Sequence, residues 1–220
     1  QLDGPSGLAI KPNGNILVVD QNNHRIQEFS KSGEYVNSWG SFGNETGQLN
    51  QPWGIAVGSD GSIYVADWGN DRIQRFDDSG SPISIYGGPN ESEGSLHRPS
   101  KPAVDSDGFV YVSDWGNESV KIYSPEGEYI QSLRGEATLS KWSEEWLDAN
   151  QDELSARKTA NLQIKELPTH LQTPYHVASQ TEHIFWGPVS VKFDDNERLY
   201  VTEHSRHRIQ IFESERIVVG

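Results

Sequence analysis

The sequence lacks cysteine and methionine, long apolar runs and an excess of basic residues. The absence of cysteine excludes disulfides and thiolate-ligated metal sites but does not identify the compartment. No apolar run approaches the roughly 20 residues that a membrane-spanning helix needs. The 18 Lys and Arg residues stand against 32 Asp and Glu, which gives a formal net charge of −14 over 220 residues. This charge counts against nucleic-acid binding, because contacts to phosphates need a basic surface.

The chain contains a repeated unit. Pro5, Pro52 and Pro99 stand 47 residues apart, and each precedes the same pattern: an apolar strand that ends in Asp, then Asn, then a strand that ends in an aromatic residue. A fourth copy begins at Pro188, after an insertion. Self-similarity at a fixed period of about 20–50 residues is typical of solenoids and propellers.

The unit reads as four strands. Ile63 and Val65 alternate with Tyr64 and Ala66, as in a half-buried strand, and the residues after them favour a tight turn. We predict first strands at Ser6–Ile10, Trp53–Val57, Ser100–Val104 and Val189–Phe193. We predict fourth strands at Tyr35–Trp39, Ile83–Tyr86, Tyr129–Leu133 and Arg216–Val219. Since such a meander cannot bury both faces alone, radial packing into a β-propeller is expected.

The runs GQLNQPWGIAV (47–57) and IYVADWGNDRIQRF (63–76) resemble the NHL-repeat family. The resemblance covers all of the chain except roughly 136–186 and implies an all-β propeller. Its four-stranded blades would lie at about 1–50, 51–97, 98–135 and 187–220. The family's usual form implies a six-bladed array of which four blades are present. A compact four-bladed ring and an arc completed by another chain are the alternatives.

The ends favour a piece of a longer array. Residues 1–5 match the late part of the linker at 48–52, and position 1 is not Met. We therefore expect a processed or excised chain. An open arc would expose apolar faces at both ends, so self-association or a second chain that completes the ring is expected.

Residues 136–186 form the insertion, for which two helices are predicted. One spans Ser140–Ala149 and places Trp142 and Trp146 near one face, and the other spans Gln151–Ala160 after a capping box that begins at Asn150. Strand alternation should place the insertion on the face that carries the turns between second and third strands. It would then be a cap over one mouth of the propeller. The simpler alternative is that the two tryptophans only anchor the cap to the rim.

The candidate site residues gather on that face. Loops on a rigid scaffold are common binding sites. The candidate ligand- or partner-binding residues are His24, Trp68, Trp115, Trp142, Trp146, His204, Arg206 and His207. The candidate metal ligands are His24, His176, His204 and His207, and the alternative is that these are exposed loop histidines. Zinc needs three or four converging ligands, which this spacing does not specify. No other cofactor is expected.

The repeated Asp-x-x-Asn-x-Arg pattern is interpreted as structural. The Asp would accept turn N–H groups, and the Arg would pair with the carboxylate of the neighbouring unit. The third copy has Ser119 in place of the Arg, and the fourth has Glu203 in place of the Asp.

Three functions compete. The absence of catalytic motifs favours a non-catalytic propeller that binds a protein or a small-molecule ligand. A metal-dependent lyase or a lactonase-like hydrolase at the channel mouth rests on fold analogy alone. RNA binding, known for tripartite-motif NHL proteins, is opposed by the net charge, so no nucleic-acid partner is expected. No membrane span is expected either.

Overall fold

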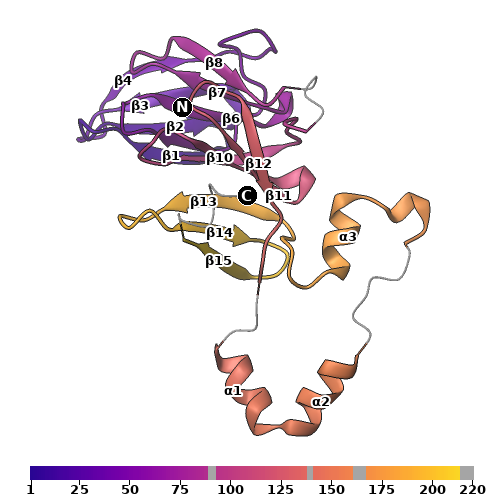
Figure 1. Ribbon diagram of the computed structural model, residues 1–220. Helices are drawn as coiled ribbons and strands as arrows, with labels where there is room; N and C mark the ends of the chain where they lie inside the picture. Colours follow the sequence, from indigo (N-terminus) through magenta and orange to yellow (C-terminus); the bar gives the residue numbers. More distant parts are fainter. Residues whose placement is uncertain (89–92, 138–140, 161–166, 214–220) are drawn as a thin grey trace.

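The computed structural model describes residues 1–88, 93–137, 141–160 and 167–213. Four antiparallel sheets are built from strands in chain order, each paired with the next (Figure 1). Sheet 1 contains β1 (Pro5–Ile10), β2 (Ile16–Asp20), β3 (Arg25–Phe29) and β4 (Tyr35–Trp39). Sheet 2 contains β5 (Ile55–Val57), β6 (Ile63–Asp67), β7 (Arg72–Phe76) and β8 (Pro82–Tyr86). Sheet 3 contains β9 (Pro99–Val104), β10 (Val110–Asp114), β11 (Ser119–Tyr123) and β12 (Tyr129–Leu133).

Sheet 4 contains β13 (Pro188–Phe193), β14 (Leu199–Glu203) and β15 (Arg208–Phe212). The predicted strand Arg216–Val219 lies outside the described residues. The other predicted strands are present with small shifts at their ends. The largest shift is in sheet 2, where β5 begins at Ile55 and not at Trp53.

The turns between second and third strands share one geometry. Sheets 1 to 3 have short 3₁₀ helices there, η1 (Gln21–Asn23), η2 (Trp68–Asn70) and η3 (Trp115–Asn117). The residue that follows is left-handed in all four sheets, with φ of 54° at His24 and Asp71, 52° at Glu118 and 51° at His207. This left-handed residue lets the chain reverse within one turn, so that the third strand pairs with the second along its full length.

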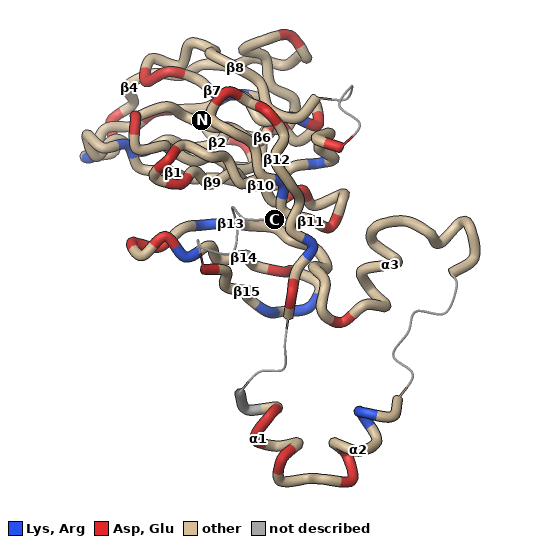
Figure 2. The backbone as a smooth tube through the Cα atoms, viewed as in Figure 1, with Lys and Arg blue, Asp and Glu red and all other residues tan. Residues whose placement is uncertain are grey.

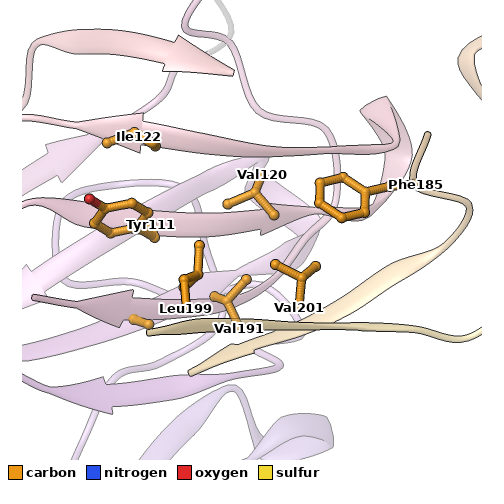
Figure 3. Packing of buried hydrophobic residues seen from close by; sticks show 8 residues of the cluster. Tyr111, Val120, Ile122, Phe185, Val191, Leu199 and Val201 are labelled. Carbon is orange, nitrogen blue, oxygen red and sulfur yellow. The ribbon is translucent and has the colours of Figure 1, made fainter. Parts of the chain in front are cut away.

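Successive sheets pack face to face through apolar clusters. Leu17 and Val19 of sheet 1 meet Ile55, Ile63 and Val65 of sheet 2. Figure 3 shows the cluster between sheets 3 and 4, which is made by Ala103, Tyr111, Val120, Ile122, Phe185, Val191, Leu199 and Val201. Within the described residues, no comparable cluster joins sheet 4 to sheet 1. The main stabilisation is therefore burial of apolar surface at the seams between sheets.

The first strands lie innermost and line an open cavity of about 440 Å³. Glycine allows the close approach of these strands, because a Cβ at Gly54 would lie 2.3 Å from the carbonyl oxygen of Ser100 on β9. This arrangement is that of a β-propeller, with meanders placed radially around a central space.

The two end sheets expose apolar side chains that the inner sheets bury. On sheet 1, Leu8 and Ile10 are 59% and 64% exposed, whereas their equivalents in sheet 2 are Ile55, which is 1% exposed, and Val57, which is half-buried. On sheet 4, Ile209 and Ile211 are 59% and 54% exposed. The equivalents of these two isoleucines in sheet 3 are Val120 and Ile122, at 0% and 2% exposed.

The insertion between sheets 3 and 4 is helical. It contains α1 (Lys141–Ala149), α2 (Gln151–Thr159), η4 (Thr169–Leu171) and α3 (Pro174–Gln180). The two predicted helices are present, although 138–140 lie outside the described residues. Figure 1 shows α1 and α2 as a pair well away from the sheets, whereas α3 contacts η3. Only this last part of the insertion lies against the turns.

Two features of the insertion correct the sequence analysis. Asn150 precedes α2 but its side chain makes no capping hydrogen bond, since its Nδ2 donates to the carbonyl of Trp146 2.7 Å away. The segment that forms α3 was not predicted as a helix. Its start has a recognisable signal, because Thr173 caps the helix through its side chain and Pro174 follows at the first helical position. No helix in the described part of the chain is long and apolar enough to cross a membrane.

Candidate recognition face

The geometry that the turns share depends on a carboxylate at the end of each second strand. In sheet 2, Asp67 accepts hydrogen bonds from the backbone N–H of Asn50 at 2.7 Å, from Asn70 at 2.9 Å, from Arg72 at 2.8 Å and from Gln74 at 3.1 Å. The same carboxylate position accepts a backbone N–H in every sheet, from Asp3, Asn50, His97 and Trp186. The carboxylate therefore fixes the linker that precedes each first strand.

The Arg of the repeat pairs with its own sheet, which corrects the expected pairing with a neighbouring unit. Arg25 binds Asp20 and Arg72 binds Asp67, each through Nε at 2.8 Å. Arg72 also donates to the carbonyls of Glu45 and Gln48 in the linker from sheet 1. The physical reason is register, because each Arg stands directly opposite its Asp in the antiparallel pair of second and third strands.

The left-handed residue at each turn links one sheet to the next. His24 Nδ1 accepts a hydrogen bond from the N–H of Gln51 at 3.0 Å, and Asp71 accepts one from Arg98 at 2.7 Å. Glu118 accepts one from the N–H of Gly187. His24 thus supports the junction between sheets 1 and 2. This contact accounts for its position without a ligand.

Aromatic and cationic side chains lie together on this face. The guanidinium of Arg98 lies over the Trp68 ring, 4.9 Å from its centroid, and that of Arg206 lies 5.5 Å from the centroid of Trp186. Tyr175 of α3 contacts Trp186 with ring centroids 5.5 Å apart. The cation–π geometry places positive charge beside half-buried tryptophans, a surface suited to planar or anionic groups of a partner.

Arg206 of sheet 4 forms hydrogen bonds with the end of α3. Its Nη2 donates to the carbonyls of Ala178 and Thr181, both at 2.7 Å, at the C-terminal end of the helix. Its Nε and the Nε1 of Trp186 are buried with no hydrogen-bond partner among the described residues. Burial lowers the pKa of Arg206, and so does the nearby charge of Arg208.

Among the described residues, the predicted histidines are not brought together as a set of three or more metal ligands. His204 and His207 are exposed, with ring centroids 6.4 Å apart, and His176 bonds through Nδ1 to Thr173 at 2.7 Å. No group of three or more His, Cys, Asp or Glu side chains among residues 1–88, 93–137, 141–160 and 167–213 could hold a metal ion.

The predicted tryptophans separate into two groups. Trp68 and Trp115 lie half-buried on η2 and η3, and η3 contacts α3. Trp142 and Trp146 belong to α1, and the Trp146 side chain is 46% exposed. Because α1 packs against α2 away from the sheets, Trp146 anchors no cap to the rim (Figure 1).

Three carboxylates are buried where sheet 3 meets sheet 4. Asp114, Glu118 and Glu203 are 0%, 3% and 1% exposed. Burial raises the pKa of Asp114 to about 6. Burial raises the pKa of Glu118 to about 7, and the Glu203 and Asp114 charges add to that effect. Asp114 has no arginine opposite it, because Ser119 occupies that place in the register.

Sequence reasoning missed Arg98, Tyr175 and Trp186 on this face. Trp186 corresponds to Asn50 of the repeat, and Arg98 corresponds to Gln51. Their large side chains at linker positions were the available signal. Figure 2 shows acidic residues spread over loops of the sheets and along α1 and α2.

The comparison with known proteins identifies the repeat. The NHL repeat matches residues 2–29, 49–76 and 185–212, which correspond to sheets 1, 2 and 4. Protein brain tumor of Drosophila melanogaster is 43% identical over 49 residues, which are 22% of this chain and 5% of that protein.

Solved structures share the fold at low identity. Virginiamycin B lyase from Staphylococcus aureus, catalytically inactive H270A with quinupristin, has a TM-score of 0.55 at 16% identity and covers 95% of this chain. A Bacteroides thetaiotaomicron protein of unknown function has a TM-score of 0.61 at 14% identity and covers 94%. The chain spans 55% of the former and 46% of the latter. These similarities establish the propeller fold alone.

Proposed function

The chain is an NHL-repeat β-propeller protein, and on that premise we propose that it is a non-catalytic interaction module. The recognition surface is the face that carries η1 to η3 and α3. The observation that supports this proposal is the set of half-buried tryptophans on this face with arginines beside them, Arg98 over Trp68 and Arg206 over Trp186.

The chemistry of this face favours a protein partner. Trp, Tyr and Arg are enriched among the residues that contribute most to protein–protein affinity, because they combine large apolar area with directed polar contacts. The turns are rigid, since each is fixed by a buried carboxylate, so little conformational entropy is lost when they bind.

The test is a binding measurement with a purified partner recovered by cross-linking to this face. Trp68→Ala and Trp115→Ala should each weaken binding by about tenfold or more, as expected for central interface residues. Tyr35→Ala is the matched control, because Tyr35 is an exposed aromatic residue on the outer strand β4. Wild-type affinity in both tryptophan variants, with the fold intact, would contradict the proposal.

The alternative is a metal-dependent lyase or a lactonase-like hydrolase at the channel mouth. The presence of virginiamycin B lyase among the structural neighbours favours it, although at 16% identity only the fold is shared. Metal analysis of the purified protein tests it. A stoichiometric metal that is lost in His204→Ala and His207→Ala would support the enzyme, and its absence from the wild type would count against it.

We also propose that the apolar ends of the arc associate with a second copy of this chain. Leu8 and Ile10 correspond to Ile55 and Val57 on one side of an inner seam, and Ile209 and Ile211 correspond to Val120 and Ile122 on the other side, which supports this proposal. One chain therefore carries both complementary halves of a seam, and a second copy can cover each. Exposed apolar area of this kind favours association through the hydrophobic effect.

Light scattering after size-exclusion chromatography tests the self-association. The wild type should give a concentration-dependent mass above that of one chain, and Ile209→Lys should shift it to the monomer. Ile130→Lys is the control, because Ile130 is 45% exposed on the outer strand β12. A wild type that remains monomeric at all concentrations would exclude the second copy, and association only with a different purified chain would identify that chain as the occupant.

A further inference from the structure

The central cavity carries positive charge in an acidic protein. The first strands of all four sheets line its volume of about 440 Å³. Most of the lining residues are small or apolar, and the ionisable ones are Lys101 on β9 and Lys192 on β13. No carboxylate belongs to the lining, although the net charge of the whole chain is −14. The sign of the charge inside the cavity is thus opposite to that of the molecule.

Both lysines depart from the repeat at positions where the other copies have small residues. Lys101 stands in the place of Gly7 and Gly54. Lys192 stands in the place of the alanines of the other three sheets, Ala9, Ala56 and Ala103. Because β9 and β13 are neighbouring inner strands, the two substitutions bring two ammonium groups to one side of the cavity.

Neither ammonium group has a hydrogen-bond or ion-pair partner within the described part of the chain. The contrast with Lys11 is direct, because its buried Nζ pairs with Glu28 at 3.1 Å and with Asp78 at 2.7 Å. Burial lowers the pKa of Lys101, and the charge of Lys192 lowers it further. A bound negative charge would relieve both the desolvation and the repulsion.

We propose that this cavity binds a small anion whose carboxylate or phosphate group lies between Lys101 and Lys192. The apolar walls formed by Val104 and Phe193 would contact a short apolar body attached to that group. Lysine binds such anions as a compact charge with three donors, and a partly enclosed cavity strengthens the attraction relative to water. This site lies on the inner strands and is separate from the turns, so it does not depend on the proposed recognition face.

Isothermal titration calorimetry at constant ionic strength tests the site with two probes, inorganic phosphate and succinate. Saturable binding of either probe with a Kd below about 10 mM is expected, and the tighter one identifies the preferred group. Lys101→Gln and Lys192→Gln should each weaken binding by about tenfold or more, because each removes one of two charges and keeps most of the side-chain volume. Lys31→Gln is the matched control, since Lys31 is an exposed lysine of sheet 1 outside the cavity lining.

A second readout does not depend on a ligand. NMR titration of the lysine side chains should show the pKa of Lys101 rising toward its ordinary value in Lys192→Gln, while Lys31→Gln leaves it unchanged. The proposal is overturned if neither probe saturates the wild type, or if both cavity variants bind like the wild type. Circular dichroism recognises a variant that fails to fold. Lys101→Arg is then measured in place of that variant, and it should retain binding because it keeps the charge.

Discussion

His24 Nδ1 accepts a hydrogen bond from the backbone N–H of Gln51, 3.0 Å away, and so connects the turn of one sheet to the start of the next. Asp71 and Glu118 make the equivalent bond to Arg98 and Gly187. The left-handed position of the turn therefore links each of these sheets to the next. A histidine, an aspartate or a glutamate can serve there, because each accepts a backbone N–H.

This bond predicts a difference between two histidines in the same conformation. His24→Ala should lower the free energy of unfolding by about 1 kcal/mol, since the Gln51 N–H loses its partner. His207→Ala is the control, because His207 has φ of 51° against 54° at His24, so both variants carry the same backbone strain. The His207 side chain has no such bond among the described residues. Urea denaturation measures both, and equal losses would show that strain alone is responsible.

The ion pair in sheet 2 should contribute more to the free energy of unfolding than the ion pair in sheet 1. Arg72 and Arg25 each bind the repeat Asp at 2.8 Å, but their side chains are 10% and 33% exposed. Arg72→Ala should cost about 3 kcal/mol, because a buried carboxylate loses its cation and two linker carbonyls lose a donor. Arg25→Ala should cost less, because water can solvate the carboxylate from the open side. Chemical denaturation measures the loss of stability in each variant. A larger loss in Arg25→Ala than in Arg72→Ala would contradict the explanation by burial.

The buried carboxylates of sheet 3 predict a stability that falls as the pH rises. The pKa values of Glu118 and Asp114 are raised to about 7 and about 6, so the folded state holds protons that the unfolded state has released. Stability should therefore decrease between about pH 4 and pH 7, by roughly 1.4 kcal/mol for each unit of pKa shift. The loss is complete above the folded pKa values.

Glu118→Gln isolates this effect. The amide oxygen can still accept the N–H of Gly187, but it carries no charge. The variant should be more stable than the wild type at about pH 8 and nearly equal at about pH 4.5, where the unfolded-state carboxyl is half protonated. Asp194→Asn is the comparison, since hydrogen bonds from Arg198 and its neighbours lower the pKa of Asp194 to about 2 despite the opposing effect of burial. The stability that the ionised Asp194 carboxylate contributes is therefore lost only as the pH falls toward its lowered pKa.

Arg206 should control the docking of α3. Arg206→Ala removes two hydrogen bonds to carbonyls of the helix end, so amide exchange in Pro174–Gln180 should become about fivefold faster or more. Arg157→Ala is the control, because Arg157 makes an exposed ion pair with Glu182 at 2.9 Å and contributes little. Mass-spectrometric hydrogen exchange reports on α3 separately from α1 and α2. Unchanged exchange in α3 would mean that its contact with η3 is sufficient.

The strands and turns could be predicted because the signals are local. Alternating apolar residues define the strands, and Gly and Asx residues mark the turns, so four copies in phase indicated the propeller. The helix α3 was missed because it has only 7 residues, although Thr173 and Pro174 mark its start. The placement of α1 and α2 could not be predicted, since amphipathic spacing indicates that a helix packs but not against what.

The site was predicted only in outline. Trp68, Trp115 and Arg206 were identified on the turns, but the roles of His24 and Arg206 as hydrogen-bonding links between elements follow from distances that no spacing specifies. The candidate histidines could not be tested for convergence from the sequence, because ligand geometry depends on residues from different sheets.

The sequence by itself determined the repeat, the strand order and the face to which the turns belong, because each of these follows from the alternation of residues within one unit. Only the tertiary structure decided which side chains neighbouring units bury and which charges they bring together. The seam that buries Val120 leaves Ile209 exposed, and two lysines that replace a glycine and an alanine face one cavity. The physical reason is that burial and electrostatic environment arise from neighbouring sheets, and no single unit contains its own neighbour.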